Sequence, residues 1–170
     1  VCPPGKTSRY CSAKSDTPCC SRECSNKTRF RRGSDCNQLT PSQAAYIAGF
    51  LDGEGSVILY RRRDAVAMRV AFANTRTSPL EWIRRVTGVG NVTTKIHANK
   101  AHATAYSLLI NSQAAYGLLK QVEPYLVLKQ EQARLAVDFF DKLRDPKLKA
   151  DRSWQYETRA QMQYLNRRGD

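Results

Sequence analysis

Two acidic side chains, Asp52 and Glu54, alternate with glycines in the stretch D-G-E-G at residues 52–55. Carboxylates beside flexible backbone favour a hard-cation site, because Mg²⁺ prefers oxygen ligands. If two such segments met, two metal ions about 4 Å apart would stabilise the attacking and the leaving oxygen of a phosphodiester. The alternative, that both acids are ordinary turn residues, stays open on these residues alone.

The segment before these acids is predicted to be a helix with Thr40 as its N-cap and Leu51 near its end. Pro41 suits the first helical position, Gln43 completes a capping box, and the glycines after Leu51 are expected to end the helix. A glycine inside a helix costs about 1 kcal/mol relative to alanine. Small residues at three- and four-residue spacing nevertheless form one face, which we predict to pack closely against another helix: Ala45, Ala48, Gly49 and Asp52. That second helix belongs either to the same domain or to a second subunit.

The rest of the chain predicts further elements from the spacing of its apolar residues. Strands are expected at 56–61, 66–74, 92–97 and 105–111. Helices are expected at 79–86, at 112–122 with Ser112 as the cap, at 130–143 and at 154–165. Glu123-Pro124 is expected to end the helix at 112–122, because the residue before proline avoids helical geometry. This order predicts an α+β domain with a four-stranded antiparallel sheet.

The charge is strongly basic, with 28 Lys and Arg against 15 Asp and Glu and a formal net charge of +13. Such an excess favours a polyanionic partner, because phosphate neutralisation releases counterions. An anionic membrane surface would suit the same charge. No apolar run of about 18 residues exists, however, so no membrane span is predicted. The opening V-C-P-P-G-K lacks the apolar core of a signal peptide, so we expect an intracellular protein in cytoplasm, nucleoid or organelle.

All six cysteines of the chain lie within its first 36 residues, and the residues between them are polar and basic. A secreted protein more often spreads its disulfides through the fold, so the clustering favours a zinc site. Metal binding would also supply folding free energy that a segment with almost no apolar residues lacks. Disulfides, or a disordered segment with free thiols, are the alternatives. We therefore divide the chain into a cysteine-rich basic segment, 1–38, and a domain, 39–170.

The stretch A-Y-I-A-G-F-L-D-G-E-G-S at 45–56 resembles the LAGLIDADG signature of homing endonucleases. The resemblance continues in F-A-N-T at 72–75, in L-E-W-I at 80–83 and in E-P-Y-L-V-L-K-Q-E-Q-A at 123–133. It implies an αββαββα fold whose sheet binds DNA. One copy of the signature implies a homodimer with two-fold symmetry. The implied activity is divalent-metal-dependent cleavage of both strands of double-stranded DNA at a long, near-palindromic site. An RNA-binding intron maturase of the same fold is the alternative.

The resemblance also implies roles for individual residues. Glu54 matches the metal-binding acid of the signature, and Gly53 would offer its carbonyl to the same Mg²⁺ or Mn²⁺. Lys129 matches a lysine that stabilises charge or organises water. Arg76 stands where relatives often have a glutamine or another polar residue, so it is expected either to position water or to contact a phosphate.

Alternate residues of a strand share one face of a sheet, and the face without helices would lie in the major groove, where base edges are distinguishable. The register from the signature places Ser56, Tyr60 and Arg62 on this face, with Arg69 on the second strand. Thr93 and Lys95 join from the third strand, and Ser107 from the fourth. Arginine and lysine on this face would bond guanine or phosphate.

The cysteine-rich segment resembles a second kind of unit, the small zinc-binding modules attached to phage and intron nucleases. C-S-R-E-C-S-N-K at 20–27 matches one half of such a module, and C-P-P-G-K at 2–6 is a shortened form of the other. A cysteine expected before the Gly-Lys pair is missing. The resemblance therefore implies a Zn²⁺ ion held by Cys2, Cys20 and Cys24, with Cys11 as the preferred fourth ligand and Cys36 and then Cys19 as the alternatives.

Overall fold

The computed structural model describes residues 35–95 and 104–167 of the chain. The order of its elements is α2 (Pro41–Glu54), β1 (Gly55–Arg62), β2 (Ala65–Asn74), α3 (Thr77–Thr87), β3 (Asn91–Lys95), β4 (Ala105–Asn111), α4 (Ser112–Val122), the short 3-10 helix η2 (Glu123–Tyr125), α5 (Gln130–Lys142), α6 (Pro146–Ala150) and α7 (Ser153–Arg167). The first seven give the predicted order αββαββα. The short elements η2 and α6 were not predicted.

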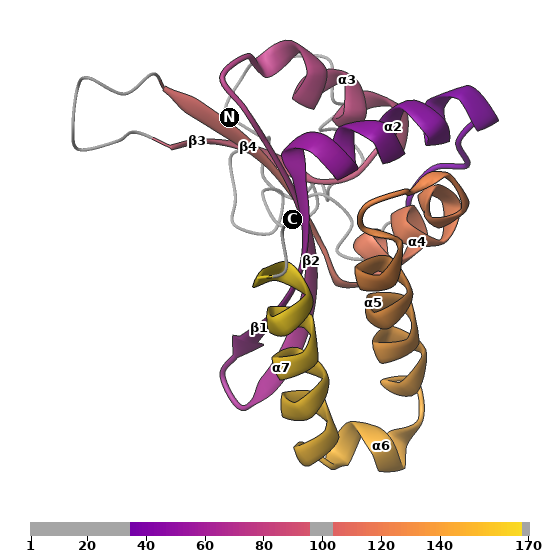
Figure 1. Ribbon diagram of the computed structural model, residues 1–170, viewed down its shortest axis with the longest axis vertical. Coiled ribbons are helices and arrows are strands. Elements are labelled where there is room, and N and C mark those ends of the chain that lie inside the picture. The colour runs from indigo at the N-terminus through magenta and orange to yellow at the C-terminus, as the bar shows by residue number, and fades with distance from the viewer. Residues whose placement is uncertain (1–34, 96–103, 168–170) are drawn as a thin grey trace, which may run out of the picture. The chain divides into compact units, whose positions relative to one another are not determined.

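The four strands form one antiparallel sheet in the order β1-β2-β4-β3. Buried and less buried residues alternate along β1 and β2, with Val57, Leu59, Val66, Met68 and Val70 on the buried face. Helices α2, α4 and α5 lie on one side of the sheet (Figure 1), and α2 and α4 also contact each other beneath it. One face of the sheet is therefore covered by helices, as predicted.

Helix α2 begins with the predicted capping box. The Thr40 hydroxyl accepts from the Gln43 N–H at 3.3 Å, and the Gln43 side chain accepts from the Thr40 N–H at 2.9 Å. The expected end at Leu51 was wrong, because the helical hydrogen bonds continue through Gly53 to Glu54, and the Gly55 N–H still donates to the Leu51 carbonyl. Glu54 is thus the last residue of a helix rather than part of a turn, and β1 begins directly after it.

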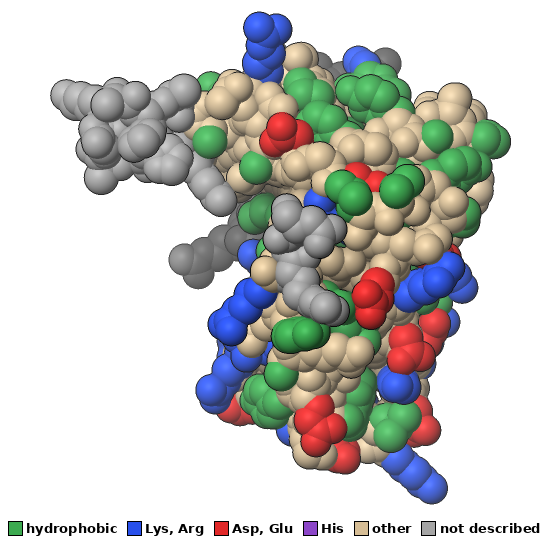
Figure 2. Space-filling view, in the orientation of Figure 1, with side chains coloured by type: hydrophobic (Ala, Val, Ile, Leu, Met, Phe, Trp, Pro, Cys, Tyr) green, Lys and Arg blue, Asp and Glu red, His purple; other side chains and the backbone are tan. Residues whose placement is uncertain are grey.

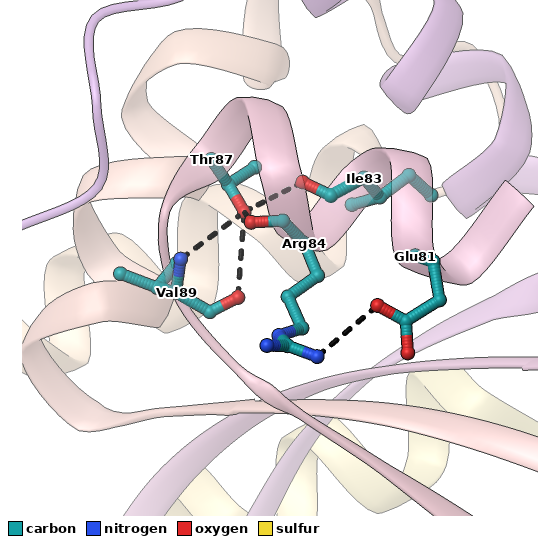
Figure 3. A network of polar contacts seen from close by, with 5 residues as sticks. All are labelled: Glu81, Ile83, Arg84, Thr87 and Val89. Carbon is teal, nitrogen blue, oxygen red and sulfur yellow. Dashed lines mark hydrogen bonds and ion pairs between the residues drawn. The ribbon is translucent and has the colours of Figure 1, made fainter. Parts of the chain in front are cut away.

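Helix α3 is joined to β3 by a buried polar turn (Figure 3). The Thr87 hydroxyl donates to the Ile83 carbonyl at 2.7 Å and lies 3.4 Å from the Val89 nitrogen, which donates to it. Gly88 has a left-handed φ of 70°, which suits glycine. On the outer side of the helix, Arg84 pairs with Glu81 at 3.1 Å. The chain therefore reverses compactly into the edge strand β3.

The side-chain amides of Gln155 and Asn166 connect helix α7 to the sheet by hydrogen bonds. Gln155 is completely buried, and its side chain accepts from the Val66 N–H at 3.2 Å while donating to the Lys149 and Asp151 carbonyls. Asn166 donates to the Val57 carbonyl at 3.0 Å. Helix α7 is therefore fixed along β1 and β2 by hydrogen bonds as well as by apolar packing.

Candidate active site and sheet surface

The carboxyl end of α2 holds the segment that precedes α5. The two carboxylate oxygens of Asp52 accept from the N–H groups of Val127, at 2.8 Å, and of Lys129, at 2.9 Å. The Lys129 ammonium in turn donates to the Asp52 carbonyl. Residues 75 to 77 positions apart in sequence are thus joined by three hydrogen bonds, which place Lys129 at the tip of α2.

Glu54 lies exposed at this tip, two residues beyond the contact with Lys129. The last carbonyls of a helix have no intrahelical donor, and the negative end of the helix dipole favours a cation. Two of these carbonyls, at Leu51 and Asp52, receive the Gly55 N–H and the Lys129 ammonium. The Gly53 carbonyl and the Glu54 carboxylate are oxygen donors of the kind Mg²⁺ accepts alongside water and phosphate oxygens. These residues therefore fit part of a divalent-metal site.

The metal site is not complete within the described residues, where no group of three or more His, Cys, Asp or Glu could hold an ion. One carboxylate and one carbonyl leave most coordination positions of an octahedrally coordinated Mg²⁺ to other ligands. Gly53 and Glu54 can therefore supply only a fraction of a metal shell from this chain.

Arg76 belongs to the same end of the sheet. Gly55 pairs with Phe72, so the residues after Phe72 continue past the junction of α2 and β1. Arg76 is exposed at the N-terminus of α3, and its N–H donates to the Asn74 side chain at 2.9 Å. The register therefore carries the chain toward Arg76 past the end of β1 that follows Glu54, and the role of Arg76 stays a prediction.

Helix α2 has an exposed face of small residues. Cβ atoms built on Gly49 and Gly53 would meet nothing within 4 Å, and Ala45 is exposed. Ala48 contradicts the prediction for this face, because it is completely buried in the core of its own chain. Asp52, also predicted for this face, uses its carboxylate within the chain. The open face therefore consists of Ala45, Gly49 and Gly53.

Two apolar side chains extend this exposed region at the tip of α2. Val127 is 82% and Leu128 69% exposed, in the segment that Asp52 holds. Tyr46, which follows Ala45 in α2, is 51% exposed, and the centroid of its ring lies 4.9 Å from that of Trp82. Exposed apolar groups around a stripe of glycines are typical of a surface that another protein covers.

The sheet face opposite the helices carries the residues predicted to contact DNA. Ser56 and Tyr60 in β1 and Arg69 in β2 alternate with buried neighbours, and Ile58 pairs with Arg69. Arg62 is exposed at the end of β1. Thr93 and Lys95 of β3 pair with Ser107 and Ala105 of β4, in register with this face. Ser107, which was also expected on this face, pairs with Ala73 and Thr93 but is only 2% exposed, so the structure does not support it as a contact residue.

Basic side chains gather beside the β1–β2 hairpin (Figure 2). Arg61, Arg62 and Arg63 are all exposed there. On the sheet face next to them, a hollow of about 350 Å³ is lined by Tyr60, Arg62, Arg69 and Asn111. Tyr60, Arg62 and Arg69 were predicted on this face from the sequence. Asn111 was missed, because the sequence predicted it only as the last residue of a strand.

The predicted zinc ligands Cys2, Cys11, Cys20 and Cys24 lie outside the described residues, as does the end of the third predicted strand. Of the cysteines, only Cys36 falls in the part that the structure describes, half-buried against α4. Burial raises the pKa of its thiol to about 11, against a smaller opposing effect of the hydrogen bond with Gln121. None of the helices in the described ranges is both long and apolar enough to cross a membrane.

Comparison with known proteins gives one domain family and a group of solved structures. Residues 41–122 match the family described as the LAGLIDADG-like domain. No curated protein matches the chain. The homing endonuclease I-CvuI, solved with a DNA target in the presence of magnesium, superposes with a TM-score of 0.57 at 20% identity, covering 73% of this chain and 82% of that one.

Two further structures share the fold. The group I intron-encoded homing endonuclease I-CeuI, complexed with DNA, gives a TM-score of 0.52 at 17% identity and covers 74% of this chain and 68% of that one. The LAGLIDADG meganuclease I-AabMI, bound to uncleaved DNA, gives 0.55 at 17% identity over 70% of this chain but only 43% of its own. These likenesses establish the α+β LAGLIDADG fold with its four-stranded antiparallel sheet.

Proposed function

We propose that this chain is a homodimeric, divalent-metal-dependent DNA endonuclease. The observation that carries the proposal is the placement of Lys129 against Asp52 at the carboxyl end of α2, two residues before Glu54 and the start of β1. Structural neighbours that share this fold were solved on DNA. A net charge of +13 suits the same partner.

The open sheet face is the proposed DNA-binding surface. An antiparallel sheet with one solvated face can lie in the major groove and present side chains to base edges. Ser56, Tyr60, Arg62, Arg69, Thr93 and Lys95 are the proposed contacts. The arginines of the β1–β2 hairpin lie at one end of this face and are expected to bind phosphates.

A second copy of the chain is proposed to complete the active site. Glycines four residues apart leave the open face of α2 without side chains, which permits another helix to approach closely. Two-fold packing of α2 on α2 would place two Glu54 carboxylates side by side and supply ligands that the described residues of one chain do not bring together. The match to less than half of the I-AabMI chain also suits a protein that contributes one half of a site.

In this arrangement Glu54 and the Gly53 carbonyl hold the divalent ion, which supplies Lewis-acid stabilisation of the scissile phosphate. Lys129, fixed against Asp52, presents a positive charge toward the same phosphate. Arg76 contacts a neighbouring phosphate oxygen. The nucleophile is water, one phosphodiester is hydrolysed in each strand, and no covalent enzyme intermediate forms.

Cleavage of DNA by the full chain tests the proposal. A duplex library with a randomised central region is incubated with Mg²⁺, and double-strand ends are sequenced to define the site. Glu54→Gln should reduce cleavage by more than roughly 100-fold while DNA binding persists, because the metal-binding charge is removed. Glu157→Gln, on the exposed side of α7, is the matched control and should cleave normally. Cleavage that survives in Glu54→Gln would remove the assignment.

The RNA-binding alternative has its own readout in the same preparation. A chain that promotes splicing of an intron transcript but leaves every duplex intact is a maturase. Zinc in the segment 1–38 remains a prediction for Cys2, Cys11, Cys20 and Cys24. Native mass spectrometry of the full chain measures it, since a bound Zn²⁺ adds its mass and a metal-free chain contradicts the prediction.

A further inference from the structure

One arginine on the open sheet face is fixed from two directions. The Nε of Arg69 donates to the Asn111 side-chain oxygen at 2.8 Å. Its guanidinium carbon lies 4.4 Å from the centroid of the Tyr60 ring. Both contacts come from neighbouring strands, because β2 pairs with β1 on one side and with β4 on the other. The plane and the direction of the guanidinium are thus set by the sheet.

The Asn111 side chain bonds Arg69 instead of capping helix α4. It is the N-cap residue of α4, not Ser112 as predicted, yet its side chain makes no cap hydrogen bond. Asparagine is among the best N-caps because its oxygen satisfies a free N–H of the first turn. The next residue, Ser112, also has an uncommon positive φ of 50°. The local structure thus forgoes stabilisation that the same side chain normally provides, and the Asn111 oxygen instead accepts the hydrogen bond from Arg69.

Arg62, on the rim of the same hollow, is different. It is exposed, and within the described part of the chain it makes no comparable hydrogen bond or ring contact. A long, unanchored arginine suits a phosphate, whose oxygens accept from many directions. An anchored one suits a target with fixed acceptor positions, because the entropy of orientation is already lost.

We infer that Arg69 reads a guanine in the major groove, with Asn111 and Tyr60 as its positioning residues. The inference rests on the proposed DNA-binding function. Because Nε is occupied by Asn111, the end of the guanidinium that carries both Nη groups remains for an external acceptor pair. Guanine offers such a pair in O6 and N7. Adenine replaces one acceptor by an amino donor, so the fixed fork rejects it. A bidentate contact of this kind discriminates between bases by roughly 5- to 150-fold.

The inference is tested by selecting duplexes from a randomised pool with the full-length wild type and three variants. Wild type should select G·C at one position in each half-site. Arg69→Lys keeps the charge but loses the fork, so the preference for guanine should fall toward equality while the salt dependence is unchanged. Asn111→Ala should weaken that preference about fivefold, the effect of one net hydrogen bond. Asn91→Ala, on β3 in register with the same face, is the matched control and should leave that position unchanged.

A second measurement identifies the acceptor atom. Replacing the selected guanine by 7-deazaguanine removes N7, so wild-type binding should weaken while binding by Arg69→Lys stays the same. Circular dichroism and thermal melts confirm that each variant is folded. The inference is overturned if Arg69→Lys and Asn111→Ala select the wild-type sequence. It is also overturned if Arg69→Ala weakens all duplexes equally with a shallower salt slope, the signature of a phosphate contact. A wild type that selects no sequence refutes the proposed function as well.

Discussion

The substitution Gly49→Ala distinguishes a monomeric chain from one that dimerises through α2. In the first case it should stabilise the protein, and in the second it should destabilise the dimer. A Cβ at Gly49 meets nothing within 4 Å in the single chain. Alanine is favoured over glycine inside a helix by about 1 kcal/mol. In a monomer the substitution should therefore be stabilising, with the melting temperature raised by about 2–4 °C for a chain of this size.

In a two-fold dimer the same methyl group enters a close helix contact twice. Overpacking a tight contact costs about 1–3 kcal/mol per site, and symmetry doubles the effect. The dissociation constant of the dimer should then rise at least roughly 30-fold, corresponding to about 2 kcal/mol. Cleavage of both strands should fall in parallel, because the second Glu54 is lost from the site.

Sedimentation at several protein concentrations, with and without the target duplex, measures the dimer, and thermal melts measure stability. Ala160→Gly on the exposed side of α7 is the reverse control: it should lower stability by a similar amount and leave self-association unchanged. A Gly49→Ala protein that melts higher, sediments as wild type does and cleaves normally would refute the proposed packing of α2 on α2.

Two smaller perturbations test other parts of the molecule. In Asp52→Asn the side chain keeps one acceptor for the N–H groups of Val127 and Lys129, and its amide N–H₂ faces the other N–H. The free energy of unfolding should fall by about 1–2 kcal/mol, and cleavage should weaken while DNA binding is retained. Unchanged cleavage would show that Lys129 does not need the support of Asp52. Cys36, with its thiol pKa raised to about 11, stays neutral at pH 8, so iodoacetamide should modify it about 100-fold more slowly than a thiol at the reference value of 9.0, with the rate rising toward pH 11. Peptide mass spectrometry follows this reaction, and a rate equal to that of the guanidinium-unfolded chain would contradict the burial.

The order of the elements and the two faces of the sheet could be predicted because they depend on local periodicity. Val57 and Leu59 alternate with Ser56 and Tyr60, so the register of β1 follows from the sequence. The length of α2 could not be predicted from glycine preferences, since Gly53 continues the helix whereas the rule expected its end. Ala48 and Gly49 are adjacent, and only the direction of the core shows that the first is buried and the second open.

The contacts that build the candidate site were also beyond prediction, because they join residues far apart in sequence. Asp52 bonds to Val127 and Lys129 across 75 and 77 positions, and Arg69 bonds to Asn111 across 42. The resemblance to a family placed Lys129 near Glu54. It did not indicate that Asp52 would hold Lys129 in place. Asn111 was predicted only as the end of a strand, with Ser112 as the helix cap, and neither prediction indicated a contact with Arg69.

Local rules are broken at the surfaces where partners are proposed. Gly49 costs α2 about 1 kcal/mol with no contact in its own chain to require the absence of a side chain. Asn111 withholds a cap that normally contributes about 1 kcal/mol to its helix. Among the described residues nothing packs against Gly49, and Asn111 exchanges its cap for the hydrogen bond with Arg69. Folded sequences often keep such costs at functional sites, so we interpret the glycine as room for a close neighbour on α2 and the asparagine as support for Arg69. These two departures from local preference lie on separate surfaces, and the proposed homodimer on DNA would account for both.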